Sequence, residues 1–324
     1  MIDIAVVGAG PCGVGVGAAA SKAGLSCTLF DKSCVVSSIS GYPTFMTFFS
    51  TPEKLEIAGV PFVVVGEKPT RREALRYYQR VVRKFDVDVR QYVRVDSVEK
   101  IAGGFRLTTT HKSGEAGSVD AKHVVIATGY FDSPNMLGVP GEDLPKVAHS
   151  YREGHTFFDQ DVVVIGGANS AVDAALEIHS WGARVTMVHF AEYLDQNVKP
   201  WVLPEIAGRI REGDIAARWR SRIVEIKPKS VIIRSDVTSQ LEEIRNDWVL
   251  AMTGYMPRRE LLVSLGVEFD EETGIPAHDT DTMETNVSKV YIAGVITAGN
   301  NANKIFIENG RDHGPRIVEA IRGK

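Results

Sequence analysis

Two short glycine-rich segments are the residues of this chain best suited to hold nucleotide cofactors. The first is Gly8-Ala9-Gly10-Pro11-Cys12-Gly13, which follows an apolar run over residues 2–7. The second is Gly166-Gly167-Ala168-Asn169-Ser170-Ala171, which follows an apolar run over residues 162–165. A glycine turn between a buried strand and a helix brings backbone N–H groups and the positive helix end to a pyrophosphate. The chain therefore predicts two dinucleotide sites, most simply one for a flavin and one for a nicotinamide.

The first segment carries the residue pattern of a dinucleotide fingerprint. Gly8 permits the tight turn, Gly10 allows close approach of the pyrophosphate, and Gly13 allows close packing of helix on strand. Asp31 stands 23 residues after Gly8, at the expected end of the second strand, and Lys32 follows it. A carboxylate there accepts the ribose hydroxyls and disfavours a 2′-phosphate. We therefore predict FAD or NAD at this site, with Lys32 among the cofactor-binding residues.

The second segment lacks that carboxylate. The position 23 residues after Gly166 holds His189. A protonated His189 could pair with a 2′-phosphate, and Lys199 is a second candidate cation; alternatively, His189 only ends a strand. Ala168 replaces the middle glycine, so the backbone is expected slightly further from the pyrophosphate. These residues favour NADPH over NADH and leave NADH open.

The three cysteines include no redox pair. Cys12 lies at a predicted helix N-terminus, where partial positive charge lowers the pKa of a thiol. It could form a transient mixed disulfide with a substrate thiol, or it could serve as a small apolar residue in the first helical turn. Cys27 lies in an apolar strand and is expected to be inert, and Cys34 lies in a loop.

The elements that must position these residues form a duplicated pattern of strand, glycine turn and helix. Thr70 and Glu73 form a capping-box pattern that marks the start of a helix over residues 70–85. Residues 87–98 and 104–110 are predicted to be antiparallel strands. The fold class is predicted as α/β with two Rossmann-like dinucleotide-binding domains. We expect an FAD domain from residues 1–132 and 257–324, with an inserted NAD(P)H domain at 133–256.

Composition narrows the class of protein. The chain has 324 residues, 24% of them charged and 44% hydrophobic, with a net charge of −4. There is no basic footprint for nucleic acid and no apolar stretch of roughly 18 residues that would span a membrane. A strand is expected to begin by residue 3, which leaves no room for a signal peptide. With few cysteines, we expect a cytoplasmic protein, and we assign no metal-binding residues.

The chain resembles the two-dinucleotide-binding flavoproteins of the low-molecular-weight thioredoxin reductase type. The segments that carry the resemblance are Gly8 to Gly13, Asp31, Ala127-Thr128-Gly129, Gly166 to Ala171, Thr253-Gly254 and Ala293-Gly294. In that family, the N- and C-terminal segments build the FAD domain and the central segment binds NADPH. Residues 149–154 hold no cysteine where that family has a Cys-x-x-Cys, so the usual dithiol relay is excluded. The family's usual basic residues are also absent at Phe190 and Ala191, and Val295 replaces a usual aspartate.

A narrower resemblance, to the bacillithiol disulfide reductases, covers these departures together. The matching segments are the Gly-Pro-Cys-Gly turn, residues 42–55 (YPTFMTFFSTPEKL), Lys199-Pro200-Trp201, residues 293–296 and residues 305–310. This resemblance implies FAD, NADPH and the reduction of an oxidised low-molecular-weight thiol. It also implies a homo-oligomer, because such flavoproteins commonly self-associate.

The remaining predicted site residues surround the flavin. The aromatic segment that contains Thr47, Phe48 and Phe49 is expected to line it, although these rings could simply be core. The predicted cofactor contacts are completed by Thr128, Gly129, Gly254, Gly294 and Ile305. Lys304, which follows Asn300, Asn301 and Asn303, could stabilise charge at N1 of the reduced flavin, or it could be a solvated loop lysine.

Other functions are compatible with the same motifs. A ferredoxin–NADP reductase of this type also lacks the cysteine pair, and a flavin-dependent monooxygenase would react with oxygen instead of a disulfide. A slow nucleotide-binding redox sensor would bind FAD and act through a partner. Turnover with rival electron acceptors separates these functions.

Overall fold

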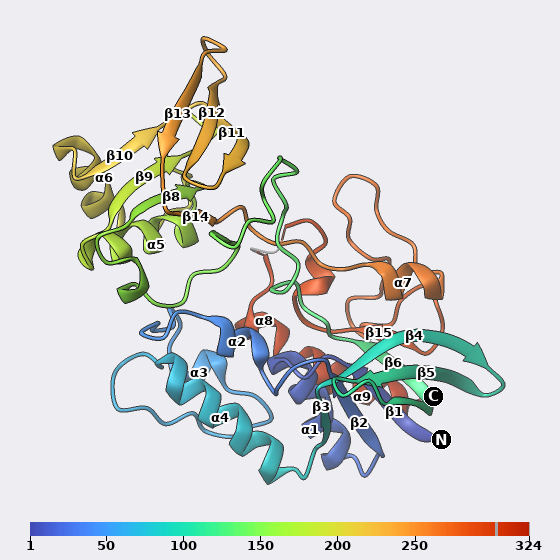
Figure 1. Cartoon of the computed structure of the whole chain (residues 1–324). Helices are drawn as coiled ribbons and strands as arrows, with labels where there is room; N and C mark the ends of the chain where they lie inside the picture. Colours follow the sequence, from blue (N-terminus) through green and yellow to red (C-terminus); the bar gives the residue numbers. More distant parts are fainter. Residues whose placement is uncertain (302–303, 324) are drawn as a thin grey trace. The chain divides into compact units, whose positions relative to one another are not determined.

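The chain forms two compact units. A computed structural model describes residues 1–301 and 304–323. Unit 1 consists of residues 1–133 and 255–324, and unit 2 consists of residues 134–254 (Figure 1). The predicted boundaries follow residues 132 and 256, within the two segments where proline and glycine interrupt the pattern.

Unit 1 is a mixed sheet whose parallel strands carry the first glycine turn. The sheet order is β3-β2-β1-β6-β5-β4, and β15 also pairs with β6. Strands β1, β2, β3, β6 and β15 pair in parallel, while β4 and β5 form an antiparallel ribbon with the first half of β6. The elements are, in chain order, β1 (Ile2–Val7), α1 (Pro11–Lys22), β2 (Cys27–Asp31), α2 (Ser37–Gly41), α3 (Pro52–Leu55), α4 (Arg71–Lys84), β3 (Asp88–Gln91), β4 (Val93–Ile101), β5 (Gly104–His111), β6 (Ala116–Ile126), α7 (Glu260–Leu265), β15 (Val290–Ile292), the 3₁₀ helix η2 (Gly294–Ala298), α8 (Ile307–Gly310) and α9 (His313–Arg322).

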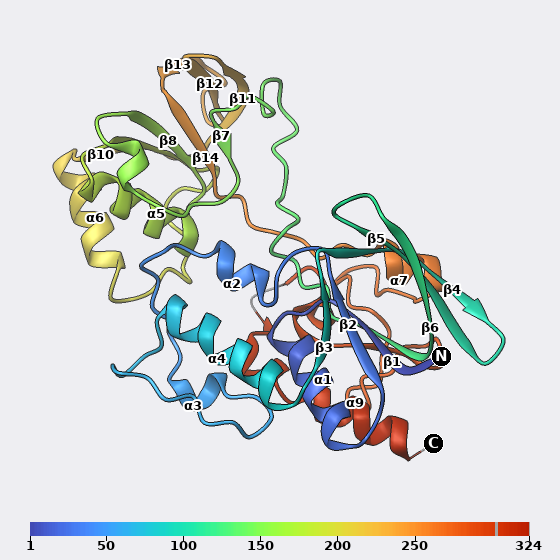
Figure 2. The same cartoon turned by 60° about the horizontal axis from the view of Figure 1, so that its bottom comes forward.

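Burial on both faces explains why β1 is an unbroken apolar run. Ile4 and Val6 belong to a core cluster with residues of α1, α4 and α9. These helices lie on one side of the sheet (Figure 2). Ala5 and Val7 pack on the opposite face with residues of β4, β5, β6 and α7. A parallel strand covered on both sides has no need for the polar alternation of a half-exposed strand.

Two local predictions in unit 1 have different outcomes. The capping box is confirmed: Glu73 N–H donates to Thr70 Oγ1 at 3.2 Å, and Thr70 N–H donates to Glu73 Oε2 at 2.8 Å. The single antiparallel strand predicted over residues 87–98 is wrong. The segment breaks at Tyr92, which has a left-handed φ of 60°, and the part before it, β3, pairs in parallel with β2.

Unit 2 repeats the arrangement of strand, glycine turn and helix. Its parallel sheet has the order β10-β9-β8-β14-β7, and a separate antiparallel sheet has the order β11-β12-β13. The elements are, in chain order, β7 (Val147–Ala148), the 3₁₀ helix η1 (His155–Phe157), β8 (Asp161–Ile165), α5 (Asn169–Ser180), β9 (Arg184–Val188), α6 (Leu203–Glu212), β10 (Ile215–Arg218), β11 (Ser221–Lys227), β12 (Ser230–Ser235), β13 (Leu241–Arg245) and β14 (Trp248–Ala251). Helices α5 and α6 cover one face of the parallel sheet, and the small sheet packs on the other.

The strand registers make the two glycine turns geometrically equivalent. In unit 1, Val7 of β1 pairs with Phe30 of β2, and in unit 2, Ile165 of β8 pairs with Val188 of β9. The residue after the pair on the second strand is Asp31 in unit 1 and His189 in unit 2. These two side chains therefore occupy the same place relative to their glycine turns.

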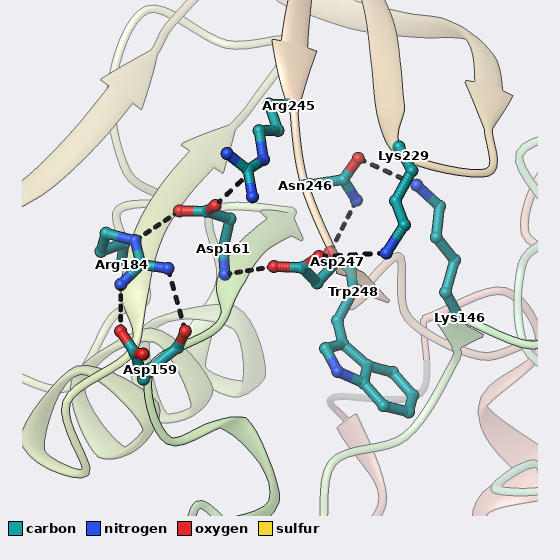
Figure 3. A network of polar contacts seen from close by, with 9 residues as sticks. All are labelled: Lys146, Asp159, Asp161, Arg184, Lys229, Arg245, Asn246, Asp247 and Trp248. Carbon is teal, nitrogen blue, oxygen red and sulfur yellow. Dashed lines mark hydrogen bonds and ion pairs between the residues drawn. The ribbon is translucent and has the colours of Figure 1, made fainter.

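A charged network holds the amino edge of the unit 2 sheet, opposite the glycine turn (Figure 3). Arg184 at the start of β9 donates to Asp159 and to Asp161, both at 2.6 Å. Asp247, just before β14, accepts from the Asp161 N–H at 3.1 Å, and Arg245 lies 3.7 Å from the Asp161 carboxylate. These contacts tie three strands together at one end and leave the carboxyl end of the sheet for a ligand.

Both units thus confirm the predicted α/β class with two Rossmann-like dinucleotide-binding folds. Across residues 1–301 and 304–323, no helix is both long enough and apolar enough to cross a membrane.

Candidate functional site

The first glycine turn is shaped by close backbone contacts. Gly8 has a φ of 110°, and a Cβ on it would lie 2.3 Å from the carbonyl oxygen of Ala127. A Cβ on Gly13 would lie 2.0 Å from the Gly8 oxygen, so helix α1 reaches the turn only with glycine there. Pro11 begins α1, where a missing N–H removes no helical bond.

Gly10 faces open space. A Cβ built on Gly10 has no atom within 4 Å, and the φ of −70° suits any residue. Val14 N–H donates the first helical bond, to the Gly10 oxygen, so the N–H groups ahead of it have no helical carbonyl to reach. Nothing in the local fold requires glycine at this position, and a pyrophosphate resting against the helix start would.

Asp31 ends β2 with its carboxylate directed at the turn. Its Oδ2 accepts from Ala9 N–H and its Oδ1 accepts from Ser33 N–H, both at 2.8 Å. Burial is the largest influence on the Asp31 pKa and raises it, against these two hydrogen bonds, which lower it. Each oxygen keeps a further lone pair for a ribose hydroxyl. The adjacent Lys32 forms an ion pair with Asp132, which belongs to the same unit.

Thr128 and Gly129 follow β6 beside the turn. The Thr128 hydroxyl is buried, and no residue of the described chain gives it a hydrogen bond. Gly129 has a left-handed φ of 68° and open space around its Cα. A buried hydroxyl without a protein partner, next to an open glycine cradle, fits a bound polar ligand such as a flavin nucleotide.

Cys12 is packed against two glycines from the end of the chain. A Cβ on Gly310 would lie 2.8 Å from the Cys12 sulfur, and a Cβ on Gly294 would lie 3.1 Å from it. The Gly294 N–H donates to Nδ1 of the buried His313 at 3.0 Å. Burial raises the pKa of Cys12 to about 12. The predicted lowering of this pKa by the helix N-terminus is therefore wrong, because desolvation of the thiolate outweighs the helix charge.

The predicted aromatic lining divides into core and surface. Phe48 is 8% exposed and packs in the core with α4, which supports the alternative that it is simply core. Phe49 and Phe45 are each 50% exposed. Thr47 is exposed and forms an isolated β-bridge with Thr70. Contact of Thr47, Phe48 and Phe49 with a flavin stays a prediction.

The segment before α8 carries the remaining predicted flavin contacts. Lys304 is exposed, and its carbonyl oxygen accepts from Asn309 Nδ2 at 2.9 Å. Ile305 is half-buried, with its Cγ2 within 3.6 Å of where a Gly310 Cβ would lie. Asn303 lies outside the described residues.

The second glycine turn has the same form as the first, but alanine replaces the glycine at its last position. Gly166 has a φ of 128°, and its Cβ would lie 2.6 Å from the Met252 oxygen. The place of Gly13 is taken by Ala171, whose methyl lies 3.2 Å from that Gly166 Cβ position. The helix α5 starts after Ala168, which is exposed like Ser170.

Side chains of α5 fix the loop that follows β9. Asn169 Oδ1 accepts from Lys199 N–H at 3.0 Å, and Asn169 Nδ2 donates to the Asn197 oxygen at 3.0 Å. The Lys199 ammonium lies 2.6 Å from Asp173 on α5, and its side chain is 11% exposed. Its charge is thus balanced within the unit; a role for Lys199 in cofactor binding stays a prediction.

His189 lies directly on the second glycine turn. Its imidazole carbons and Nε2 lie 2.6–2.8 Å from where a Gly167 Cβ would be, so only glycine leaves room for the ring. His189 is buried, and its Nδ1 has no hydrogen-bond partner in the described part of the chain. Burial has the largest effect on the pKa of His189 and lowers it. The charge of Asp195 raises this pKa, and the charge of Arg222 lowers it. The direction of this shift works against a protonated His189, and its pairing with a 2′-phosphate stays a prediction.

Three arginines that the sequence analysis missed lie beside His189. Arg218 ends β10, and Arg220 and Arg222 alternate with it through the turn into β11. The signal in the sequence is the alternation Arg-Trp-Arg-Ser-Arg over residues 218–222, but only the fold brings it to the second strand of the nucleotide site. Gly254, the last predicted contact in unit 2, has a φ of 82° and accepts from Asn135 N–H at 3.0 Å.

Clusters of metal-ligating side chains and the cysteines complete the description of the candidate groups. Residues 1–301 and 304–323 hold no cluster of three His, Cys, Asp or Glu side chains that could bind a metal ion. Cys27 is partly buried, and desolvation raises its pKa to about 12, in agreement with an inert strand residue. The three cysteines are free.

The comparison with known proteins decides the family. The family described as "Pyridine nucleotide-disulphide oxidoreductase" matches residues 5–294. The chain belongs to this family. The chain is accordingly an oxidoreductase, and membership of this family implies the use of a flavin and a nicotinamide nucleotide.

Individual relatives match the chain over nearly its whole length. The "Bacilliredoxin reductase Bdr" of Bacillus subtilis (strain 168) is 46% identical over 98% of this chain and 96% of its own length. The solved structure "Bacillithiol Disulfide Reductase Bdr (YpdA) from Bacillus cereus" has a TM-score of 0.96 and 45% identity, and covers 99% of each chain. A ferredoxin–NADP reductase of Ignicoccus hospitalis is a distant relative, 26% identical over 92% of this chain and 90% of its own. The predicted resemblance to bacillithiol disulfide reductases within a flavin disulfide oxidoreductase family is confirmed.

Proposed function

We propose that this protein is an FAD-dependent, NADPH-oxidising reductase of bacillithiol disulfide or of a similar small disulfide. The observation that carries the proposal is the pair of equivalent glycine turns, which hold Asp31 at the ribose position in unit 1 and His189 in unit 2. The carboxylate suits the unphosphorylated ribose of FAD, and His189 places no negative charge where it would repel a phosphorylated ribose. The two Bdr relatives supply the substrate class by their names.

In this proposal, unit 1 holds FAD. The turn from Gly8 to Gly13 and the start of α1 bind the pyrophosphate, and Asp31 binds the adenosine ribose. The buried Thr128 hydroxyl is the protein group that still needs a partner. Lys32, Gly129, Gly294 and Ile305 complete the predicted contacts.

Unit 2 holds the nicotinamide dinucleotide. The start of α5 after Ala168 binds the pyrophosphate, and the wider turn at Gly166 and Ala171 sets its distance from the backbone. His189 forms the floor beside the ribose. The overall reaction consumes NADPH, one proton and one disulfide and yields NADP⁺ and two thiols. When bound, the flavin supplies the two-electron chemistry that links these half-reactions.

Cys12 is our candidate for direct contact with the disulfide. Its position at the start of α1 places it beside the proposed flavin pyrophosphate, between Gly294 and Gly310. Attack of the Cys12 thiolate on bacillithiol disulfide would release one bacillithiol and leave a mixed disulfide, which two electrons and one proton resolve to the second bacillithiol. Because burial raises the pKa of this thiol, the thiolate is scarce at neutral pH, and the rate of disulfide reduction should rise with pH. Lys304 is the candidate that stabilises charge on the reduced flavin.

The test is purification followed by cofactor analysis and turnover. We expect a yellow protein with one FAD per chain that oxidises NADPH when bacillithiol disulfide or a bacilliredoxin carrying a bacillithiol mixed disulfide is present. Ferredoxin and oxygen serve as rival acceptors. Fast ferredoxin reduction without thiol release would replace this function with the ferredoxin reductase alternative. A colourless protein that takes up no flavin would overturn the proposal entirely.

We also propose that the protein acts in the cytoplasm as a homo-oligomer. Its free cysteines suit a reducing compartment, where NADPH is the available reductant. Light scattering coupled to size-exclusion chromatography measures the mass of the particle, and a mass of one chain would contradict the oligomer.

A further inference from the structure

The turn between β10 and β11 is fixed against the segment that follows β9. His189 N–H donates to the Arg218 oxygen, and Ser221 N–H donates to the His189 oxygen, both at 3.0 Å. Arg220 N–H donates to the Ala191 oxygen at 2.9 Å. Three backbone bonds therefore position the arginine-bearing turn against residues 189–191, independently of the side chains.

Two of these arginines present charge beside the ribose position. The Arg222 guanidinium lies 5.0 Å from the centre of the Phe190 ring, and its Nε donates to Asp236 at 2.9 Å. The Arg220 guanidinium lies 2.5 Å from Glu192. Both side chains are about half exposed, so each is accessible to a ligand in part.

The third arginine, Arg218, forms an ion pair with Glu242. Arg218 donates to both carboxylate oxygens of Glu242 on β13, through Nε and Nη2. A bidentate pair of this kind uses the donors that would bind a phosphate. We therefore separate Arg218 from the pair Arg220 and Arg222.

The position of these charges relative to the turn is set by His189. Its ring lies on Gly167 of the glycine turn, and it occupies the place that Asp31 has in unit 1. In a dinucleotide fold, that place faces the 2′-position of the adenosine ribose. The charge of Arg222 reaches the imidazole, because it acts on the protonation of His189.

We propose that Arg222 and Arg220 form the binding site for the 2′-phosphate of NADPH, beside the His189 ring that lies on Gly167. This inference rests on the proposed use of a nicotinamide dinucleotide in unit 2 and adds the residues that select its phosphorylated form. The present partners, Glu192 and Asp236, are singly charged carboxylates, and Glu192 is 79% exposed. A phosphate with nearly two charges and three acceptor oxygens competes well for both guanidinium groups.

The inference is tested by binding of nucleotide fragments, without turnover. Isothermal titration of the FAD-loaded protein compares 2′,5′-ADP, which carries the 2′-phosphate, with 5′-AMP, which lacks it. We expect wild-type protein to bind 2′,5′-ADP at least about tenfold more tightly than 5′-AMP, the effect of one charge-assisted hydrogen bond. Arg222→Ala should remove most of that preference, and Arg220→Ala should remove part of it. In both variants the affinity for 5′-AMP should change by less than about twofold, since neither guanidinium contacts the adenine or the 5′-phosphate in this arrangement.

Matched variants separate this result from general charge or folding effects. Arg209→Ala removes a similarly exposed arginine of unit 2, which pairs with Asp214 just before the amino end of β10, and it should leave both affinities unchanged. Arg222→Lys keeps the charge without the planar fork and should restore part of the 2′,5′-ADP preference. Unfolding curves and FAD content show that each variant is folded.

The outcomes distinguish the inference from the function on which it rests. If wild-type protein prefers 2′,5′-ADP and neither arginine variant reduces that preference, the phosphate site lies elsewhere and the inference is wrong. Equal affinity for the two fragments also overturns it, while leaving an NADH-dependent enzyme intact. If neither fragment binds and neither competes with NADPH, the nicotinamide site in unit 2 fails, and the inference fails with it.

Discussion

Replacing Gly10 by alanine should remove FAD without unfolding the protein. A Cβ at this position has no neighbour within 4 Å and the φ of −70° is ordinary, so the folded chain accepts it. Alanine is a poorer N-cap than glycine, but it reduces the freedom of the unfolded chain, and the two effects together should leave stability within about 1 kcal/mol. The methyl group would instead occupy the space through which a pyrophosphate approaches the start of α1, and we expect FAD binding to weaken about 100-fold or more.

The assay compares stability with and without the cofactor. Wild-type protein with free FAD at about 100 times its dissociation constant gains about 2.7 kcal/mol, and the Gly10→Ala variant should lose nearly all of that gain while unfolding normally without FAD. Gly13→Ala is the contrasting change: its Cβ would lie 2.0 Å from the Gly8 oxygen, so it should destabilise the protein even without FAD. Gly208→Ala, on α6 of unit 2 with no atom closer than 4.0 Å to its Cβ, is the control that should keep FAD. A Gly10→Ala protein that purifies with one FAD per chain would refute the assignment of this turn.

Three further predictions concern buried groups. Folding lowers the pKa of His313 from 6.5 to about 4, mainly through burial. The stabilising contribution of the neutral side chain is therefore complete above pH 6.5, and about 3 kcal/mol of it is lost as the pH falls towards 4. Urea unfolding at pH 7 and 4.5 should show a flatter pH dependence for His313→Asn, which keeps an acceptor for the Gly294 N–H. Cys12→Ala should keep FAD and the reduction of an artificial dye but lose disulfide reduction, and undiminished disulfide turnover would assign Cys12 to packing alone. Gly167→Ala should cost about 1–3 kcal/mol by displacing the His189 ring, and most of that cost should disappear in a His189→Ala background; additive costs in a double-mutant cycle would contradict the contact.

The parts of the fold that local chemistry dictates were predictable from the sequence. The capping box at Thr70 depends on two residues three positions apart, and the structure contains it. The equivalence of Asp31 and His189 depends on a count of 23 residues from each glycine turn, and the strand registers bear out that count. Such features survive because they require only neighbouring residues and one strand pair.

What the sequence could not provide depends on contacts between distant segments. A single strand is predicted over residues 87–98 because tyrosine rarely adopts the left-handed backbone conformation that Tyr92 has in the structure. The thiol of Cys12 was expected to be acidic, since its local setting is a helix start; its burial comes from glycines nearly 300 residues later in the chain. Arg220 and Arg222 reach the second site through the pairing of β10 with β9, which local sequence does not reveal.

In our proposed function, the same arrangement of strand, glycine turn and helix binds a different nucleotide in each unit. The glycines and the helix start fix where a pyrophosphate can rest, and this part is nearly the same in both units. The choice of ribose depends on the next residue after the paired strands and on the charges behind it. In unit 1 this residue is Asp31, whose charge and hydrogen bonds exclude a phosphate. In unit 2, burial and the charge of Arg222 lower the pKa of His189, and in our proposal the positive charge for the phosphate comes instead from Arg220 and Arg222. A histidine alone is largely uncharged at neutral pH, whereas arginines keep their charge, so the proposed phosphate site should not depend on pH in that range.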